Sequence, residues 1–130
     1  MQADGHVFFE LYVLDLAHHV AIFRDALGFS VIEDDGDFVK LASSHGTVLL
    51  NSTTTLPPGH PFAGYRTAPR RGIGVELGFV ARDLARARQQ ALKIDGAVVT
   101  EVTHQEWGMS DFRILSREGY FIRVTTPDEG

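Results

Sequence analysis

The sequence of 130 residues contains no cysteine. Disulfides, thiolate metal sites and a cysteine nucleophile are therefore excluded for this chain, and cysteine usage says nothing about its redox compartment. Long apolar runs are absent too, because no stretch approaches the roughly 20 apolar residues that a membrane-spanning helix needs. The first residues also lack the basic start and small-residue cleavage site of a secretory signal. These absences predict a cytoplasmic protein without a membrane partner.

Basic residues are fewer than acidic ones, with 12 Lys and Arg against 17 Asp and Glu, so the formal net charge is −5. A negative chain repels phosphate backbones, and no stripe of Lys and Arg alternates with aromatic residues. The sequence also has no P-loop and no Gly-x-Ser-x-Gly elbow. We therefore expect no nucleic-acid partner, and the motifs identify no catalytic residue.

An internal repeat is the most informative feature that the chain does contain. The stretches "VLDLAHHVAIFRDALGFSVIE" and "VARDLARARQQALKIDGAVVTE" match at a fixed offset of 68 residues. The identical pairs in this frame are Asp15 and Asp83, Leu16 and Leu84, Ala17 and Ala85, Gly28 and Gly96, Val31 and Val99, and Glu33 and Glu101. Agreement in one frame indicates a duplicated unit. A 44% hydrophobic content is enough for one compact domain over residues 1–130.

Each unit begins with a strand and continues with a helix. Apolar residues at the odd positions of 7–13 alternate with Phe8, Glu10 and Tyr12, which predicts a strand over 7–14. Asp15 suits a helix N-cap, and Gly28 suits the left-handed residue after a helix at 16–27. Strands are then expected at 29–34, 37–42 and 46–52. The second unit repeats this order with a strand at 74–81, a helix at 84–94 that stops at Gly96, and strands at 97–102, 109–116 and 120–126.

Two βαβββ modules joined by a linker, with "FRDALGF" early and "EWGMSDFRILSREGY" late, resemble the vicinal oxygen chelate superfamily. That group covers glyoxalase I, extradiol dioxygenases, fosfomycin resistance enzymes and bleomycin resistance proteins. The resemblance divides the chain into a first module at 6–52, a linker at 53–72 and a second module at 73–127. It implies an α+β fold in which the modules form an eight-stranded curved sheet, or cup, with two outer helices. The Trp-Gly, Asp-Phe and Gly-Tyr pairs look most like the metal-free bleomycin resistance branch, which binds its ligand without chemistry.

Enzymes of this superfamily hold a divalent metal inside the cup, and the resemblance implies where its ligands would stand. The corresponding positions are Phe8 and Glu76 on the first strands and Leu50 and Arg123 on the last strands. Of these, Glu76 alone is an ordinary metal ligand, because Phe and Leu lack a suitable lone pair and a guanidinium repels a cation. We therefore expect no cofactor.

An alternative keeps a divalent metal on Glu76 with His6 or Glu10, which share one face of the first strand. A terminal His is more often a surface residue, and two carboxylates beside Arg123 more often form an ion-pair network. The remaining histidines of interest, His18, His19, His45 and His60, are expected to be solvated.

The opposite charges of Glu76 and Arg123 have two interpretations. Facing each other in a partly buried cup, they could simply hold the sheet together. Alternatively, one of them binds a polar group of a ligand while aromatic side chains form apolar walls. The ligand-binding residues expected on the second interpretation are Phe8, Glu10, Tyr12, Phe38, Glu76, Trp107, Phe112 and Arg123, with Phe121 as a further wall.

Trp107 is the single tryptophan and precedes Gly108. The resemblance to bleomycin resistance proteins implies that this turn lies at the rim of a ligand crevice, where an indole stacks on planar ligands and attracts cations. The other interpretation is a loop Trp folded over the end of the barrel. The acidic residues of the segment 33–37 and the net charge would favour a cationic ligand.

Three functional classes follow. The expected one is a metal-free protein that binds a small hydrophobic or cationic ligand, such as an antibiotic or natural product, in a crevice without catalysis. The alternatives are a metal-dependent lyase, isomerase or dioxygenase, and a binding subunit that serves a pathway. Members of the family usually complete their crevices across a two-fold interface, and a small chain gains stability by covering its sheet edges, so we also expect a homodimer.

Overall fold

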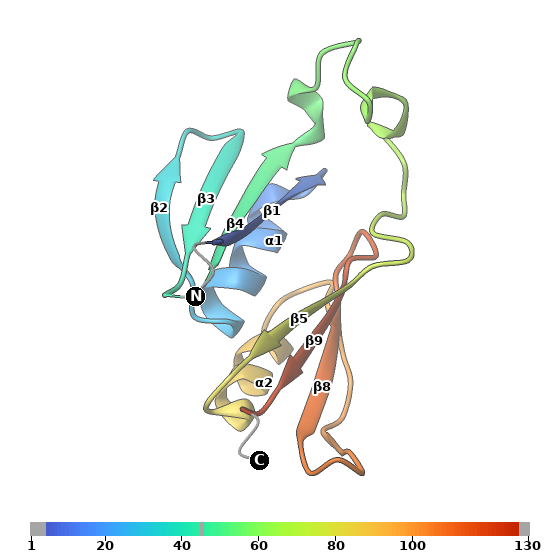
Figure 1. Ribbon diagram of the computed structural model, residues 1–130. Helices are drawn as coiled ribbons and strands as arrows, with labels where there is room; N and C mark the ends of the chain where they lie inside the picture. Colours follow the sequence, from blue (N-terminus) through green and yellow to red (C-terminus); the bar gives the residue numbers. More distant parts are fainter. Residues whose placement is uncertain (1–4, 45, 128–130) are drawn as a thin grey trace.

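The computed structural model describes residues 5–44 and 46–127 (Figure 1). The strands and helix of the first module are β1 (Val7–Val13), α1 (Leu16–Ala21), β2 (Ser30–Asp34), β3 (Phe38–Ala42) and β4 (Gly46–Ser52). Those of the second module are β5 (Glu76–Val80), α2 (Leu84–Leu92), β6 (Val98–Val99), β7 (Thr103–His104), β8 (Ser110–Leu115) and β9 (Phe121–Thr125). The predicted α+β class is confirmed. His45 lies outside the described residues.

The described strands number nine rather than the expected eight, because the strand predicted at 97–102 is interrupted. β6 and β7 pair with opposite ends of β8. Between them, the hydroxyl of Thr100 accepts a hydrogen bond from the backbone N–H of Arg113 at 2.8 Å. In a continuous strand this N–H of Arg113 would donate to a backbone carbonyl. Here the side-chain oxygen of Thr100 accepts the hydrogen bond instead, and the strand is interrupted at this point.

The strands form two separately hydrogen-bonded sheets. The first has the order β1-β4-β3-β2, and the second has the order β5-β9-β8-β6 with β7 also on β8. β1 and β5 are edge strands, each parallel to the last strand of its own module. Each sheet has its own helix on one face, and the described strands close no barrel (Figure 1). The two-module architecture is confirmed, with the curved surface divided between two sheets.

The duplicated residues repeat their structural roles. Asp15 and Asp83 each accept a hydrogen bond from the backbone N–H three residues later, both at 3.0 Å, and so cap α1 and α2. Gly28 and Gly96 follow the helices with φ of 78° and 84°, a left-handed conformation that favours glycine. The predicted caps and stops are confirmed. The helix predicted at 16–27 continues beyond α1 as a π-helical turn at Ile22–Ala26.

One hydrophobic core lies between the helices and the sheets. The ring of Phe23 packs against those of Phe9, Phe29 and Phe79, with centroids 6.4, 6.1 and 5.6 Å apart. Because Phe79 comes from β5, this cluster joins the two modules. Phe112 is fully buried in the same core. Its predicted role as a ligand wall is wrong, since the alternation along β8 turns it toward α2.

Polar groups form a second junction between the modules. His18 and His19, expected to be solvated, are 6% and 0% exposed, so that prediction is wrong. The reason is tertiary: the turn between β8 and β9 covers the start of α1. Nδ1 of His18 bonds the backbone carbonyl of Asp95 at 3.0 Å, and Nε2 of His19 bonds the hydroxyl of Ser116 at 3.0 Å.

Glu118, in the same turn, is also buried. Its carboxylate accepts the backbone N–H groups of Leu14 and Asp15 at 2.8 and 2.6 Å and pairs with Nε of Arg71 at 3.1 Å. Arg71 comes from the linker and is buried, so part of the linker packs against the two modules. None of the helices in the described ranges is long and apolar enough to cross a membrane.

Candidate ligand-binding site

The outer face of the first sheet, turned away from α1, carries Phe8, Glu10 and Tyr12 of β1. Phe38 joins them because its register partner Asn51 is also the register partner of Tyr12. Phe8 is 64% exposed, while the other predicted residues here are partly buried. All four predicted residues of the first module thus share one face, which we call the first outer face.

Neutral donors hold the Glu10 carboxylate on this face. The Tyr12 hydroxyl donates to it at 3.1 Å and the Asn51 amide at 3.3 Å. Desolvation, and then the contact with Glu10, raise the pKa of Tyr12. The linker covers part of the face, because the rings of His60 and Phe62 lie 5.1 and 5.2 Å from the Tyr12 ring. A groove of about 490 Å³ remains between β1 and the linker.

The corresponding surface of the second sheet, turned away from α2, is the second outer face. It carries Glu76 of β5 and Arg123 of β9. Arg123 has Gly78 and Arg113 as its register partners on the two neighbouring strands. Oε1 of Glu76 lies 3.6 Å from Nη1 of Arg123 and 3.8 Å from Nη2 of Arg113. The predicted pair is therefore part of a larger network.

Asp111, which is not among the predicted ligand-binding residues, is the centre of this network. Its side chain is fully buried. It accepts hydrogen bonds from Nη1 of Arg113 at 2.8 Å and from Nε2 of Gln105 at 3.0 Å, and it lies 3.5 Å from Nε of Arg123. An acidic and a basic residue two apart on a predicted strand share a face, so the stretch "DFRIL" contains the pattern that could have identified it.

Trp107 lies in the turn between β7 and β8 and is 60% exposed. The turn is closed by the N–H of Gly108, which donates to the carbonyl of Gln105 at 3.0 Å, and Gly108 has a φ of 92°. The guanidinium carbon of Arg123 lies 5.9 Å from the centroid of the Trp107 ring, within the range of a cation–π contact. The turn thus brings an accessible aromatic ring to the second outer face.

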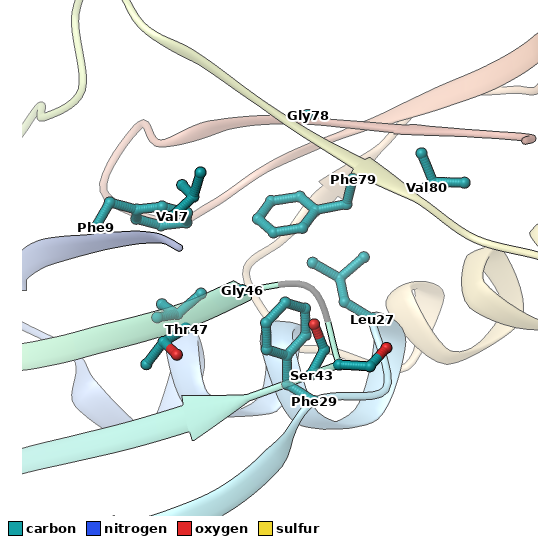
Figure 2. Close-up of a pocket in the computed structure, with 12 residues that line it drawn as sticks. Val7, Phe9, Leu27, Phe29, Ser43, Gly46, Thr47, Gly78, Phe79 and Val80 are labelled. Carbon is teal, nitrogen blue, oxygen red and sulfur yellow. The ribbon is translucent and has the colours of Figure 1, made fainter. Parts of the chain in front are cut away.

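A second hollow lies between the edges of β1 and β5, an apolar pocket of about 470 Å³ (Figure 2). Phe79 points from β5 toward Leu27 and Phe29, while Phe9 closes the pocket from β1. Its described lining residues carry no charge. The pocket depends on how the two modules pack, so strand patterns within one module could not reveal it.

Leu50 is fully buried in the core on the α1 side of β4. Its placement in the cup, which the resemblance implied, is wrong. The register partner of Glu10 on β4 is Leu49, which belongs to the first outer face instead. Neither leucine offers a donor atom to a metal.

The sequence profile of the glyoxalase/bleomycin resistance protein/dioxygenase superfamily matches residues 5–128. The chain belongs to this superfamily. No curated protein matches the sequence.

Solved structures share the superfamily fold at low identity. A family enzyme from Burkholderia phytofirmans PsJN superposes with a TM-score of 0.70 at 16% identity, covering 92% of this chain and 95% of that chain. TioX from Micromonospora sp. ML1 superposes with a TM-score of 0.70 at 17% identity, covering 94% of this chain and 98% of that chain. A bleomycin resistance determinant encoded on the transposon Tn5 superposes with a TM-score of 0.61 at 15% identity, covering 95% of this chain and 98% of that chain. At these identities the likeness shows the fold alone.

The residues present do not fit the divalent metal that enzymes of the superfamily hold. Glu76 faces two guanidinium groups, which would repel a cation. In the alternative set, Nε2 of His6 lies 3.1 Å from Oγ1 of Thr47, and Glu10 is held by neutral donors. Among residues 5–44 and 46–127, no three His, Asp or Glu side chains converge as a metal would require.

Proposed function

We propose that this superfamily member binds a small, planar, hydrophobic or cationic ligand, such as an antibiotic or another natural product, in a crevice without catalysing a reaction. The observation that carries the proposal is the exposed indole of Trp107 beside the charged network of the second outer face. An accessible aromatic ring next to a few oriented polar groups is typical of small-molecule sites. One structural neighbour is a bleomycin resistance determinant, which is in keeping with an antibiotic as the ligand.

A cationic ligand is favoured only by long-range electrostatic attraction to the chain as a whole. The net charge of −5 attracts cations. The acidic segment 33–37, however, lies around the β2–β3 hairpin, at the opposite end of the molecule from the start of β8 (Figure 1). Oδ1 of Asp35 accepts the N–H groups of Asp37 and Phe38 at 3.1 and 2.8 Å. The local role of this segment is to build the hairpin turn.

The proposal includes a homodimer. The accessible surface of the chain is 8040 Å². A compact monomer of 14.3 kDa exposes about 6,800 Å² by the usual scaling with mass. The difference of about 1,200 Å² exceeds the roughly 800 Å² that each partner buries in a standard interface, so the chain has enough surface for one. Exposed apolar side chains such as Phe8, Val80 and Trp107 lie on or beside the two outer faces. A molecular mass of twice 14.3 kDa, measured by light scattering, would support the dimer. The mass of a single chain at high protein concentration would refute it.

Titration with bleomycin-type compounds, other cationic aromatic compounds and neutral aromatic compounds tests the ligand proposal. Trp107 fluorescence and calorimetry are followed at low and high salt. Binding below millimolar concentration supports the proposal, and the absence of any response refutes it. Incubation with Ni, Mn, Zn and Fe salts tests the metalloenzyme alternative. One tightly bound ion per chain, lost in Glu76→Gln, would favour that alternative.

A further inference from the structure

Arg123 has more hydrogen-bond donors than its neighbours use. A guanidinium carries five N–H donors in one plane. The nearest acceptors are Asp111 at 3.5 Å and Glu76 at 3.6 Å, and the side chain makes no hydrogen bond to the described residues. Because the side chain is 31% exposed, these donors can reach an acceptor from solution.

Two side chains flank the guanidinium of Arg123. Its central carbon lies 5.9 Å from the centroid of the Trp107 ring. Asp111, itself held by Arg113 and Gln105, faces its Nε atom. With Nε turned toward a buried carboxylate, the two Nη groups point away from it, which is the arrangement that binds a carboxylate through two parallel hydrogen bonds.

Open space adjoins Arg123 on the β5 side. The register partner there is Gly78, and a Cβ atom at this position would meet no other atom within 4 Å. Phe121, two residues before Arg123 on the same face, is 37% exposed. A planar molecule therefore has room beside the guanidinium and an apolar surface to cover.

We infer that Arg123 binds the carboxylate of a planar aromatic acid. This inference rests on the proposed binding of a small planar ligand, and it gives that ligand a carboxylate in place of the cationic group considered above. An acid bound through two hydrogen bonds lies in the plane of the guanidinium. Its aromatic ring then lies near the exposed indole of Trp107, which offers an apolar face to it. Glu76 is the competing acceptor, because its carboxylate faces Nη1 of Arg123 when no acid is bound.

Three ring-matched probes test the inference by calorimetry: 2-naphthoate, neutral 2-naphthamide and cationic 2-(aminomethyl)naphthalene. We expect naphthoate to bind about tenfold more tightly than the amide, because a hydrogen bond to a charged group contributes more binding free energy than a hydrogen bond between neutral groups. Arg123→Gln should remove this preference, and Arg123→Lys should reduce it by losing the planar fork. Glu76→Gln should strengthen naphthoate binding by removing the competitor.

Arg24→Gln is the matched control, since it removes one positive charge at an exposed helical site that pairs with Asp25. It should leave the ratio of naphthoate to amide affinity unchanged. Circular dichroism of each variant reports folding, and Arg123→Lys keeps the test valid if Arg123→Gln does not fold. Equal or tighter binding of the amide or the ammonium probe would overturn the carboxylate inference while the proposed function stands. No binding of any probe or antibiotic would overturn both.

Discussion

The backbone N–H of Arg117 donates a hydrogen bond to Nε2 of His18 at 3.0 Å. Nε2 must therefore be unprotonated, so Nδ1 carries the proton and donates it to the carbonyl of Asp95. In His19, Nδ1 donates to the carbonyl of Asp15 at 2.7 Å, and in the neutral ring Nε2 accepts from the hydroxyl of Ser116 at 3.0 Å. Both histidines hold the modules together in their neutral form.

Stability is expected to fall as the pH drops below about 6.5. Burial lowers the pKa of both His18 and His19 from the ordinary value of 6.5, and the charge of Arg117 lowers that of His18 further. Below 6.5 the unfolded chain binds protons that the folded chain does not, so the free energy of unfolding decreases. Above 6.5 both states are neutral and this contribution is constant. Urea unfolding between pH 8 and pH 5 measures the slope.

His6→Gln is the control for this experiment, because His6 is exposed and lies outside the junction between the modules. His18→Asn, which keeps a donor for Asp95, should make the slope shallower. A stability that is equal at pH 8 and pH 5.5 in the unaltered protein would contradict the prediction.

Glu118→Gln should lower the free energy of unfolding by about 3 kcal/mol, because it leaves the buried guanidinium of Arg71 without its charged partner. Glu101→Gln is the matched control. It breaks the ion pair of Arg88 with a carboxylate that is 91% exposed, and such surface pairs contribute about 0.5 kcal/mol or less. Denaturant titrations of the two variants should differ clearly, and equal losses would show that the Glu118 junction does not hold the modules.

Gly96→Ala should be more destabilising than Gly28→Ala, although both glycines have similar positive φ values. At Gly28 a Cβ atom would meet nothing within 4 Å, so only the backbone cost of about 1 kcal/mol applies. At Gly96 it would collide with the guanidinium of Arg117, which must leave its contacts with Asp15 and Asp95. Melting temperatures of the two variants provide the measurement. A smaller loss for Gly96→Ala would contradict the packing described here.

Trp107→Ala should weaken binding of any aromatic ligand roughly tenfold, since stacking on an aromatic ring contributes about 1 to 2 kcal/mol. The fold should remain intact because the side chain is mostly exposed. Calorimetry gives the affinity and circular dichroism the fold. Tyr65→Ala is the control for the loss of a surface aromatic ring, because Tyr65 lies in the linker and is 64% exposed, close to the 60% of Trp107. An unchanged affinity in Trp107→Ala would place the ligand elsewhere.

Local chemistry was enough to predict the two modules. Asp15 and Asp83 cap helices, and Gly28 and Gly96 end them, because these preferences depend on a few neighbouring backbone groups. Strand alternation likewise predicted that Phe8, Glu10 and Tyr12 share a face. The interruption after β6 was missed, since it depends on a hydrogen bond between Thr100 and a residue 13 positions away.

The site was predictable only in part. Glu76 and Arg123 were selected from the family resemblance, and strand alternation accounts for the face they share. The polar positions of β8 contain the pattern that identifies Asp111. The prediction for Phe112 is wrong because an aromatic residue in a strand can belong to a pocket but more often belongs to the core, as it does here.

The sequence by itself determined the repeat, the element order and the alternation of each strand, because these are set by interactions within about one turn or one strand pair. Tertiary structure alone decided that His18 and His19 are buried, that Glu118 meets Arg71, and that Trp107 lies against Arg123. Each of these outcomes joins segments that are far apart in the chain. The physical reason is that burial and desolvation depend on what packs against a residue, which its own neighbours in sequence do not specify.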